Sequence, residues 1–427
     1  MTRPPKILGI KSRGIGKDGC KAMRQALTKT KLILIHAMKS EIKPTATNER
    51  DSAESSNPSQ EFPQPRRLAR RSFLRNLGMG AALLAPGAAL LGNANKALGD
   101  LDDRRHLPDG DVAILKLLAA VELIEADLWQ QYNELGGVDA PDSGYKAGLV
   151  ILDGDQPQYI ADNTDDEMSH AAFLNAYLAS KGEQQVDLRQ FATLQPSQVS
   201  FVPQTGRLTN LKQLTVDTSW WTRYRSTTNP DFDATFPNAV PSLDTGLHTA
   251  IPRHNNELGD PNNPSDHVKA IAFTAGFHFG FIEQGGTSLY ATLAQKVTSL
   301  EVLRILLSIG GSEIMHFQTW QDKAGNATPL TDFDPINNST VTFADLTTGQ
   351  PETLQANLIM PEPCEFISRS LPACSIIRPT GRGQLDARGA INSFIADELF
   401  RGQSPAFFTL IHSLARAADA AEREVGD

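Results

Sequence analysis

The sequence has few cysteines, and their spacing excludes the commonest cysteine-based sites. Only three of its 427 residues are cysteine: Cys20, Cys364 and Cys374. Two neighbouring cysteines cannot form a structural zinc site by themselves, and the spacing of Cys364 and Cys374 matches no redox motif. In an oxidising compartment a disulfide between these two would close a short loop, and two unpaired thiols are the alternative.

Other familiar signatures are also missing. The sequence has no phosphate-cradling glycine loop and no nucleophile elbow. The formal charge is −9, and residues 1–94 carry 17 Lys and Arg against 6 Asp and Glu, so the remainder carries 23 against 43. This acidic remainder argues against nucleic acid and anionic membrane surfaces as partners. With 40% hydrophobic and 21% charged residues, the composition is that of a globular protein.

The basic N-terminal arm, residues 1–94, resembles a twin-arginine (Tat) export signal. Arg70 and Arg71 precede Phe73 and Leu74, and a small apolar run then leads to a small-residue cleavage site at 92–94. That run is too short and too rich in Gly and Ala for a spanning helix, so no stable membrane anchor is expected. We expect disorder before the signal, a mature fold that begins near residue 95, the Tat machinery as a partner, and a periplasmic or secreted location.

The central feature is a Glu-x-x-His pair that occurs twice, at Glu167 and His170 and again at Glu313 and His316. On an α-helix, a spacing of three residues leaves the two side chains about 60° apart around the axis, so both can face one point. One such pair is weak evidence by itself. Two pairs on predicted helices form a much more specific signal.

Each pair follows a glutamate embedded in an apolar helix. Glu125 and Glu283 are both preceded by Ile and followed, seven residues later, by Tyr. Glu122 also interrupts the apolar stripe of the first helix and could be the ligand instead. We prefer Glu125 because its context repeats around Glu283, whereas the counterpart of Glu122 is Gly280.

Apolar periodicity predicts four helices that carry these residues. Their expected ranges are 111–135, 156–181, 266–296 and 298–324. A long insertion, 183–264, separates the second helix from the third. It is either a structured excursion or lid, or else a surface decoration with no further role. The bundle is expected over 95–325, followed by a C-terminal extension, 326–427, with loops, short strands and helices. The fold class is therefore mainly α, a four-helix bundle with an insertion and an extension.

Lesser candidates are assigned mostly structural roles. His278 faces away from Glu283 and is expected to pack or to support the site. His248, His254 and Glu257 are expected to be solvated. Tyr132 and Tyr290 either hydrogen-bond carboxylates or pack in the core. Glycines around Glu283 indicate close helix contacts, a π-bulge or room for a small ligand.

The order Glu, Glu-x-x-His, Glu, Glu-x-x-His is the ligand set of a dinuclear iron or manganese centre in a four-helix bundle. Carboxylates stabilise oxidised metals and can bridge two ions, while one imidazole per metal leaves coordination positions open. Buried without a cation, such carboxylates would repel one another and shift their pKa values. The alternative is a bundle whose site is degenerate or whose carboxylates face solvent.

With these motifs, residues 125–320 resemble the ferritin-like superfamily, which includes ferritins, rubrerythrins and manganese catalases. The stretches Leu-Ile-Glu-Ala and Glu-Met-Ser-His are most similar to exported ferritin-like domain proteins related to plant desiccation-related proteins. The resemblance implies two iron or manganese ions, or a mixed pair, held by six ligands: Glu125, Glu167, His170, Glu283, Glu313 and His316. It does not determine the reaction.

Three functions remain open at this point. The first is redox chemistry at the metal pair: metal oxidation, peroxide removal or oxygen activation, with a small oxidant or metal ion as substrate. The second is a non-catalytic stress or desiccation-related role that retains the bundle. Iron storage ranks last, because the insertion and the extension should obstruct a closed cage.

Overall fold

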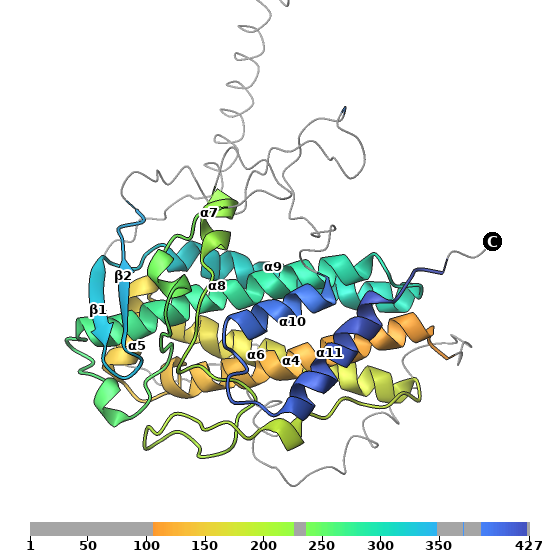
Figure 1. Ribbon diagram of the computed structural model, residues 1–427, viewed down its shortest axis with the longest axis horizontal. Helices are drawn as coiled ribbons and strands as arrows, with labels where there is room; N and C mark the ends of the chain where they lie inside the picture. The colour runs from red at the N-terminus through yellow and green to blue at the C-terminus, as the bar shows by residue number, and fades with distance from the viewer. Residues whose placement is uncertain (1–105, 226–235, 348–369, 371–385, 425–427) are drawn as a thin grey trace, which may run out of the picture. The chain divides into compact units, whose positions relative to one another are not determined.

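In the computed structural model, the chain is described over residues 106–225, 236–347, 370 and 386–424, and this part is mainly helical (Figure 1). Its framework is four long helices. They are α4 (Asp109–Gly136), α6 (Gln156–Ser180), α8 (Asp266–Ala294) and α9 (Leu300–Ala324). Each begins and ends within two residues of the predicted range, and the mainly helical fold class is confirmed.

The helices pack in two close pairs, α4 with α6 and α8 with α9. Their apolar stripes meet in one continuous core, which contains Trp129, Phe279 and Trp320 at full or nearly full burial. Near the start of α4, Asp111 accepts hydrogen bonds from the backbone N–H of Thr298 and Ser299, each at 2.8 Å. One buried carboxylate thus ties the start of α4 to the start of α9.

A short helix, α5 (Gly144–Leu152), lies between α4 and α6 and was not predicted. It packs against α8, where a Cβ on Gly276 would lie 2.4 Å from Leu152. This close approach explains why position 276 of α8 is a glycine. Position 280 is a glycine because the ring of Trp220 would lie 2.4 Å from a Cβ on Gly280.

The insertion forms a packed layer over the bundle. Its described elements are the 3-10 turns η1 (Arg189–Phe191), η2 (Pro241–Asp244) and η3 (Asn255–Glu257), and the short helix α7 (Ser219–Arg225). Trp220, Trp221 and Tyr224 are buried, which favours a structured excursion over loose decoration. Phe232 lies outside the described residues.

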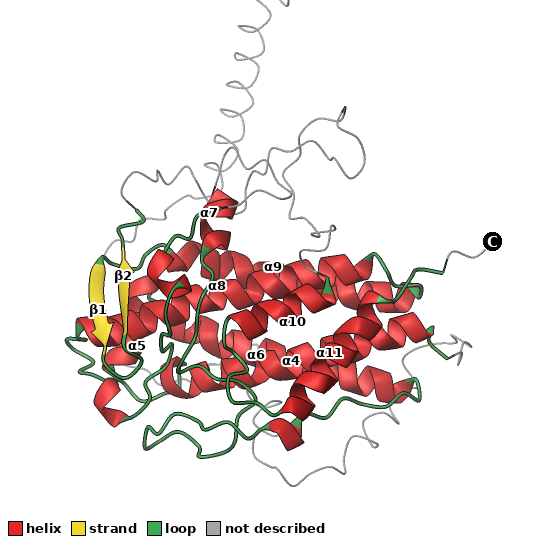
Figure 2. Ribbon diagram, in the orientation of Figure 1, coloured by secondary structure: helices red, strands yellow, loops and turns green. Residues whose placement is uncertain are grey.

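Beyond the bundle, β1 (Leu330–Asp334) and β2 (Ser339–Phe343) form an antiparallel hairpin in which Leu330 pairs with Phe343 (Figure 2). The chain ends with α10 (Ala387–Ala396), which contacts α8, and α11 (Pro405–Asp419), which contacts α4. Gln403 donates to the backbone carbonyls of Phe191 and Leu208, so the extension is also joined to the insertion.

No helix within the described ranges is both long and apolar enough to cross a membrane. The proposed export signal, with Arg70 and Arg71, lies outside the described residues, as do the three cysteines. Those expectations therefore stay predictions.

The insertion is joined to the hairpin by a buried ion-pair network centred on Arg253. Its guanidinium donates to Glu257 and, at 2.8 and 2.9 Å, to Asp334. We expect Arg253→Met to lower the free energy of unfolding by about 3 kcal/mol, because it removes the guanidinium that two buried carboxylates share. Urea denaturation measures this change.

The matched control is Arg189→Met, since Arg189 is 73% exposed and pairs with Asp187 at the surface. That change should leave the free energy of unfolding almost unchanged, because solvent screens an exposed ion pair. Equal losses in the two variants would contradict a structural role for the Arg253 network.

Candidate metal centre

Each long helix brings at least one carboxylate to the centre of the bundle, and α6 and α9 each bring an imidazole as well. Two groups of side chains could each hold a metal ion. Within each group, every residue offers one ligand atom, and these atoms all lie within 4.8 Å of one another. The first group is Glu122, Glu167, His170 and Glu313. The second is Glu167, Glu283, Glu313 and His316. Glu167 and Glu313, one from each Glu-x-x-His pair, belong to both groups.

In the first group, the ring of His170 faces three carboxylates. Its Nδ1 lies 3.1 Å from Glu167 Oε2 and 3.4 Å from both Glu122 Oε2 and Glu313 Oε1. The three carboxylates come from α4, α6 and α9, so three helices converge on this single ring nitrogen.

The second group repeats this arrangement around His316. Its Nδ1 lies 3.1 Å from Glu167 Oε1 and 3.3 Å from Glu283 Oε2. The two imidazole rings are 6.3 Å apart between centroids. Two similar ligand groups therefore lie side by side and share the carboxylates of Glu167 and Glu313 between them.

Several buried atoms of this cluster make no well-aligned hydrogen bond, although some lie close to an imidazole or carboxylate of the cluster. They are Glu122 Oε2, Glu283 Oε2, both carboxylate oxygens of Glu313, and His316 Nδ1. Buried polar atoms are nearly always paired, so each exception needs an explanation. Here the orphaned atoms point into a cluster of hard oxygen and imidazole donors, which is the donor set that iron and manganese prefer. The residues present therefore fit a metal pair.

Neighbouring side chains hold the carboxylates from outside. Asn163 Nδ2 donates to Glu167 Oε1 at 2.7 Å and to Glu283 Oε1 at 3.0 Å. The hydroxyl of Tyr290 donates to Glu122 Oε1. Asp166 Oδ2 lies 3.1 Å from His316 Nε2 and so directs the other ring nitrogen toward the cluster.

The buried acids change one another's protonation. Burial raises the pKa of Glu313 well above its usual value, and the charge of Glu167 raises it further. Burial also raises the pKa of Glu122, to about 7. Glu167 differs: burial would raise its pKa, but hydrogen bonds from His170 and His316 lower it to about 2.

The same carboxylates act on the two histidines. Burial lowers the pKa of His170, but hydrogen bonds to Glu122, Glu167 and Glu313 raise it more, and the net shift is upward. The net pKa of His316 is raised in the same way by Glu283 and its neighbours. Without a metal, protons supply the positive charge of the cluster, and a metal ion would have to displace them.

From α4, the arrangement brings in Glu122, whereas the sequence led us to prefer Glu125. Glu125 is buried, 2% exposed, and close enough to the other acids for their charges to raise its pKa, but it belongs to neither group. The repeated context around Glu125 and Glu283 does not extend to the packing around them. At Gly280, the counterpart of Glu122, the ring of Trp220 fills the space. Which of the two binds metal stays a prediction for experiment.

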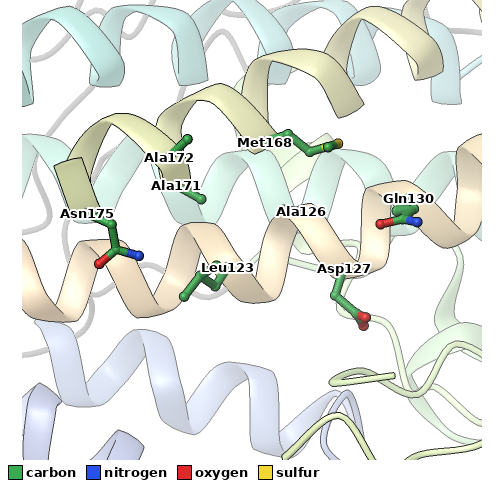
Figure 3. Close-up of a pocket in the computed structure, with 8 residues that line it drawn as sticks. All are labelled: Leu123, Ala126, Asp127, Gln130, Met168, Ala171, Ala172 and Asn175. Atoms are coloured by element: carbon green, nitrogen blue, oxygen red, sulfur yellow. The ribbon is translucent and has the colours of Figure 1, made fainter. Parts of the chain in front are cut away.

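The cluster is accessible to solvent only at its histidines. The side chains of His170 and His316 are 12% and 11% exposed, whereas those of Glu122, Glu167, Glu283 and Glu313 are 0–1% exposed. A separate surface hollow of 360 Å³ lies between α4 and α6 (Figure 3). It contains none of the cluster residues. It is lined by Leu123, Ala126, Asp127, Gln130, Met168, Ala171, Ala172 and Asn175.

The structure bears out some of the expectations for the other histidines and for Glu257, and it corrects others. His278 is fully buried and hydrogen-bonds Tyr132, so it packs as expected. The expectation of solvated residues in the insertion was wrong for His248 and Glu257, which are 3% and 4% exposed because the insertion folds onto the bundle. It holds for His254, whose side chain is 43% exposed.

Asn163 was missed by sequence reasoning. The one available signal was its position one helical turn before Glu167, on the same face of the helix.

These features define a class of protein: a four-helix bundle with a buried cluster of glutamates and histidines that can hold metal. The family model described as "Ferritin-like domain" matches residues 110–326, just over half of the chain. The chain belongs to the ferritin-like domain family. No curated protein and no solved structure matches it significantly.

The raised pKa of Glu122 predicts how the stability of the metal-free protein depends on pH. Burial raises the pKa of Glu122 to about 7 in the folded protein, whereas a free glutamate has a pKa of 4.5. Its contribution to stability is therefore full below pH 4.5 and is lost as the pH rises to 7. At about 1.4 kcal/mol per pKa unit, this amounts to about 3 kcal/mol.

We expect the decline in the free energy of unfolding between pH 4.5 and 7 to be smaller in Glu122→Gln, which cannot titrate. Denaturant unfolding in the presence of a chelator measures it. Glu301→Gln is the control, because Glu301 is a surface residue whose pKa is lowered. The same decline in Glu122→Gln as in the unchanged protein would exclude Glu122 as its source.

Proposed function

We propose that the cluster binds two iron or manganese ions and that the protein carries out redox chemistry with a small oxidant. The observation that supports this most strongly is the sharing of Glu167 and Glu313 between two ligand groups. A carboxylate that belongs to both ligand groups is placed to bridge two cations. The proposed ligands are Glu122, Glu167, His170, Glu283, Glu313 and His316, with Glu125 as the alternative to Glu122.

When bound, the metal pair supplies electrons to dioxygen or peroxide, or takes them from ferrous ion. The protein's own part is to exclude water and to position the ligands. Glu167 and Glu313 would be shared between the two ions, while Asn163 and Tyr290 keep their carboxylate partners oriented. Because only His170 and His316 are accessible, reactants have to be small.

We also propose that the protein is exported through the Tat pathway and acts in the periplasm or outside the cell. Arg70 and Arg71 with the following Phe73 and Leu74 support this. That route carries folded proteins, so the metals could be loaded before export. The similarity to desiccation-related proteins supports a role in stress, which is either catalytic or limited to metal binding.

The shared carboxylates predict an asymmetry among ligand variants. Glu167→Gln should lose both metal ions, because both ligand groups contain Glu167. His170→Ala should lose only the ion of its own group. Elemental analysis of the protein purified after export measures the metal content of each variant, and peroxide-consumption and ferrous-oxidation assays measure turnover.

Two comparisons make this test specific. Glu122→Gln and Glu125→Gln, measured side by side, identify the ligand from α4. Retention of two metal ions in Glu167→Gln would refute the bridged pair. Two bound ions without turnover would favour the non-catalytic stress role.

A pair of adjacent glycines allows a second test of the site. A Cβ on Gly286 would lie 2.5 Å from Glu313 Oε2, whereas a Cβ on Gly285 would meet nothing within 4 Å. We expect Gly286→Ala to displace the Glu313 carboxylate and to reduce metal content. Gly285→Ala should retain it, since alanine is the better helix former by about 1 kcal/mol.

Metal content per chain, measured together with the helical circular dichroism signal, separates displacement of a ligand from unfolding. Full metal content in Gly286→Ala would show that Glu313 is not needed in its present position.

A further inference from the structure

The β1–β2 hairpin has one covered edge and one open edge. At the β2 edge, Ser242 Oγ accepts a hydrogen bond from the Thr342 N–H at 2.9 Å and donates to the Thr342 carbonyl at 3.3 Å. In an antiparallel ladder, two opposite residues point their backbone groups either at each other or both outward. Thr331 is opposite Thr342, so it points its N–H and C=O outward from β1, and so does Phe333, two residues further along.

The outward backbone groups of β1 have no partner. Within the described part of the chain, no residue donates to or accepts from the backbone of Thr331 or Phe333 at this edge. Both residues are exposed, and the side chain of Phe333 is on the outer face of the hairpin at 55% exposure. The hairpin lies at the end of the bundle where α8 begins (Figure 1). An open strand edge of this kind is a template for pairing with another extended chain.

The sequence around β1 is symmetric in the features that control pairing. Asp332 is the central residue of the strand, with Thr331 and Phe333 on either side. Pro329 and Pro335 lie three residues before and after Asp332, and a proline has no N–H to donate. If two copies of β1 run antiparallel with Asp332 opposite Asp332, Thr331 faces Phe333. The two prolines then face each other, whereas sliding one copy by two residues would leave an outward carbonyl facing a proline.

The side chains fit the same register. On the exposed face, Phe333 of each copy would lie beside Thr331 of the other, and a cross-strand pair of an aromatic and a β-branched residue stabilises a sheet. On the opposite face, Asp332 would meet its own counterpart, but each carboxylate has a cation beside it. His267 Nδ1 lies 2.7 Å from Asp332 Oδ2. Hydrogen bonds to Glu257 and Asp332 raise the pKa of His267 to about 9, so the ring is charged at neutral pH and offsets the repulsion.

We propose that β1 is a self-association edge, at which two copies of this chain pair antiparallel about Asp332 and join two hairpins into one four-stranded sheet. Thr331 of each copy exchanges N–H···O=C hydrogen bonds with Phe333 of the other. The metal cluster lies inside each bundle, so this inference does not depend on the proposed function. The flanking prolines end the pairing on both sides, and they do so without leaving a donor unpaired.

The first test is sedimentation equilibrium of the full-length chain over a range of concentrations, where we expect a monomer–dimer equilibrium. Thr331→Pro removes an outward N–H that the hairpin itself does not use, and proline is tolerated at such an edge position. The dissociation constant of the dimer should rise about tenfold or more, because each copy loses one donor. Thr331→Val is the matched control, since it retains the N–H and a β-branched side chain, and it should keep the dimer. Circular dichroism checks that each variant is folded.

A pair of double variants tests the register without touching the backbone. Thr331→Lys combined with Phe333→Lys places lysine opposite lysine across the proposed interface, and it should abolish the dimer. Thr331→Lys combined with Phe333→Glu places lysine opposite glutamate, and it should keep the dimer. In a register with Thr331 opposite Thr331, the second combination would instead set like charges against each other. The two double variants therefore distinguish the proposed register from its neighbours.

Hydrogen exchange followed by mass spectrometry locates the interface. The peptide that contains β1 should exchange more slowly as the protein concentration is raised, because the outward N–H groups become hydrogen-bonded. The exposed residues Leu300 and Leu307 of α9, at 70% and 61% exposure, mark another apolar surface. A dimer formed through that surface would leave the exchange of the β1 peptide independent of concentration.

A dimer that is lost with two lysines, kept with lysine and glutamate, and protected at β1 supports the proposal. A chain that is monomeric at every concentration would overturn it, and the prolines would then serve to keep the edge unpaired. A dimer that persists in folded Thr331→Pro, or that is lost in both double variants, would overturn it as well. If Thr331→Pro fails to fold, the double variants and the exchange of the β1 peptide decide the question.

Discussion

The structure is organised around the mutual repulsion of carboxylates that are buried in the middle of a helical bundle. Glu122, Glu167, Glu283 and Glu313 are at most 1% exposed, and Glu125 is close to them. Taking a charge out of water is expensive unless an opposite charge or several donors compensate it. His170 and His316 supply part of that compensation, and the orphaned oxygens indicate that cations supply the rest.

The side chains packed around this cluster orient its carboxylates and also stabilise the bundle. Asn163 joins carboxylates of α6 and α8 and is itself held by Trp320 of α9. Tyr290 of α8 reaches Glu122 of α4. Apart from the hydrogen bond of Asn163 to Glu167, which lies within α6, each of these hydrogen bonds links separate helices at the level of the site. Packing and ligand orientation are thus achieved by the same side chains, which is how a scaffold preorganises a metal site.

The long helices and their ligand pairs could be predicted because their signals are local. Glu167 and His170 share one helical turn, and so do Glu313 and His316, and apolar periodicity delimits each helix to within two residues. The helix α5 was missed because its nine residues are too few to show a period. The burial of the insertion was missed because its contacts connect residues far apart in the sequence.

The choice between two glutamates on α4, Glu122 and Glu125, shows most clearly what a sequence repeat leaves open. Glu125 and Glu283 share a local context, which is genuine evidence that the two halves of the bundle are related. The packing around them is different, however, because Trp220 from the insertion occupies the place at Gly280 that the Glu122 side chain fills in the other half. A repeat identifies equivalent helix positions, but it does not reveal which foreign segment covers them.

This difference between the halves also makes the two proposed metal positions unequal. The one beside His316 also has Glu283, which Asn163 joins to Trp320. The one beside His170 has Glu122 instead, held by Tyr290. An amide therefore orients the carboxylate at one position, and a phenol orients it at the other. Two bound ions would then have different neighbours, although their ligands are of the same kinds.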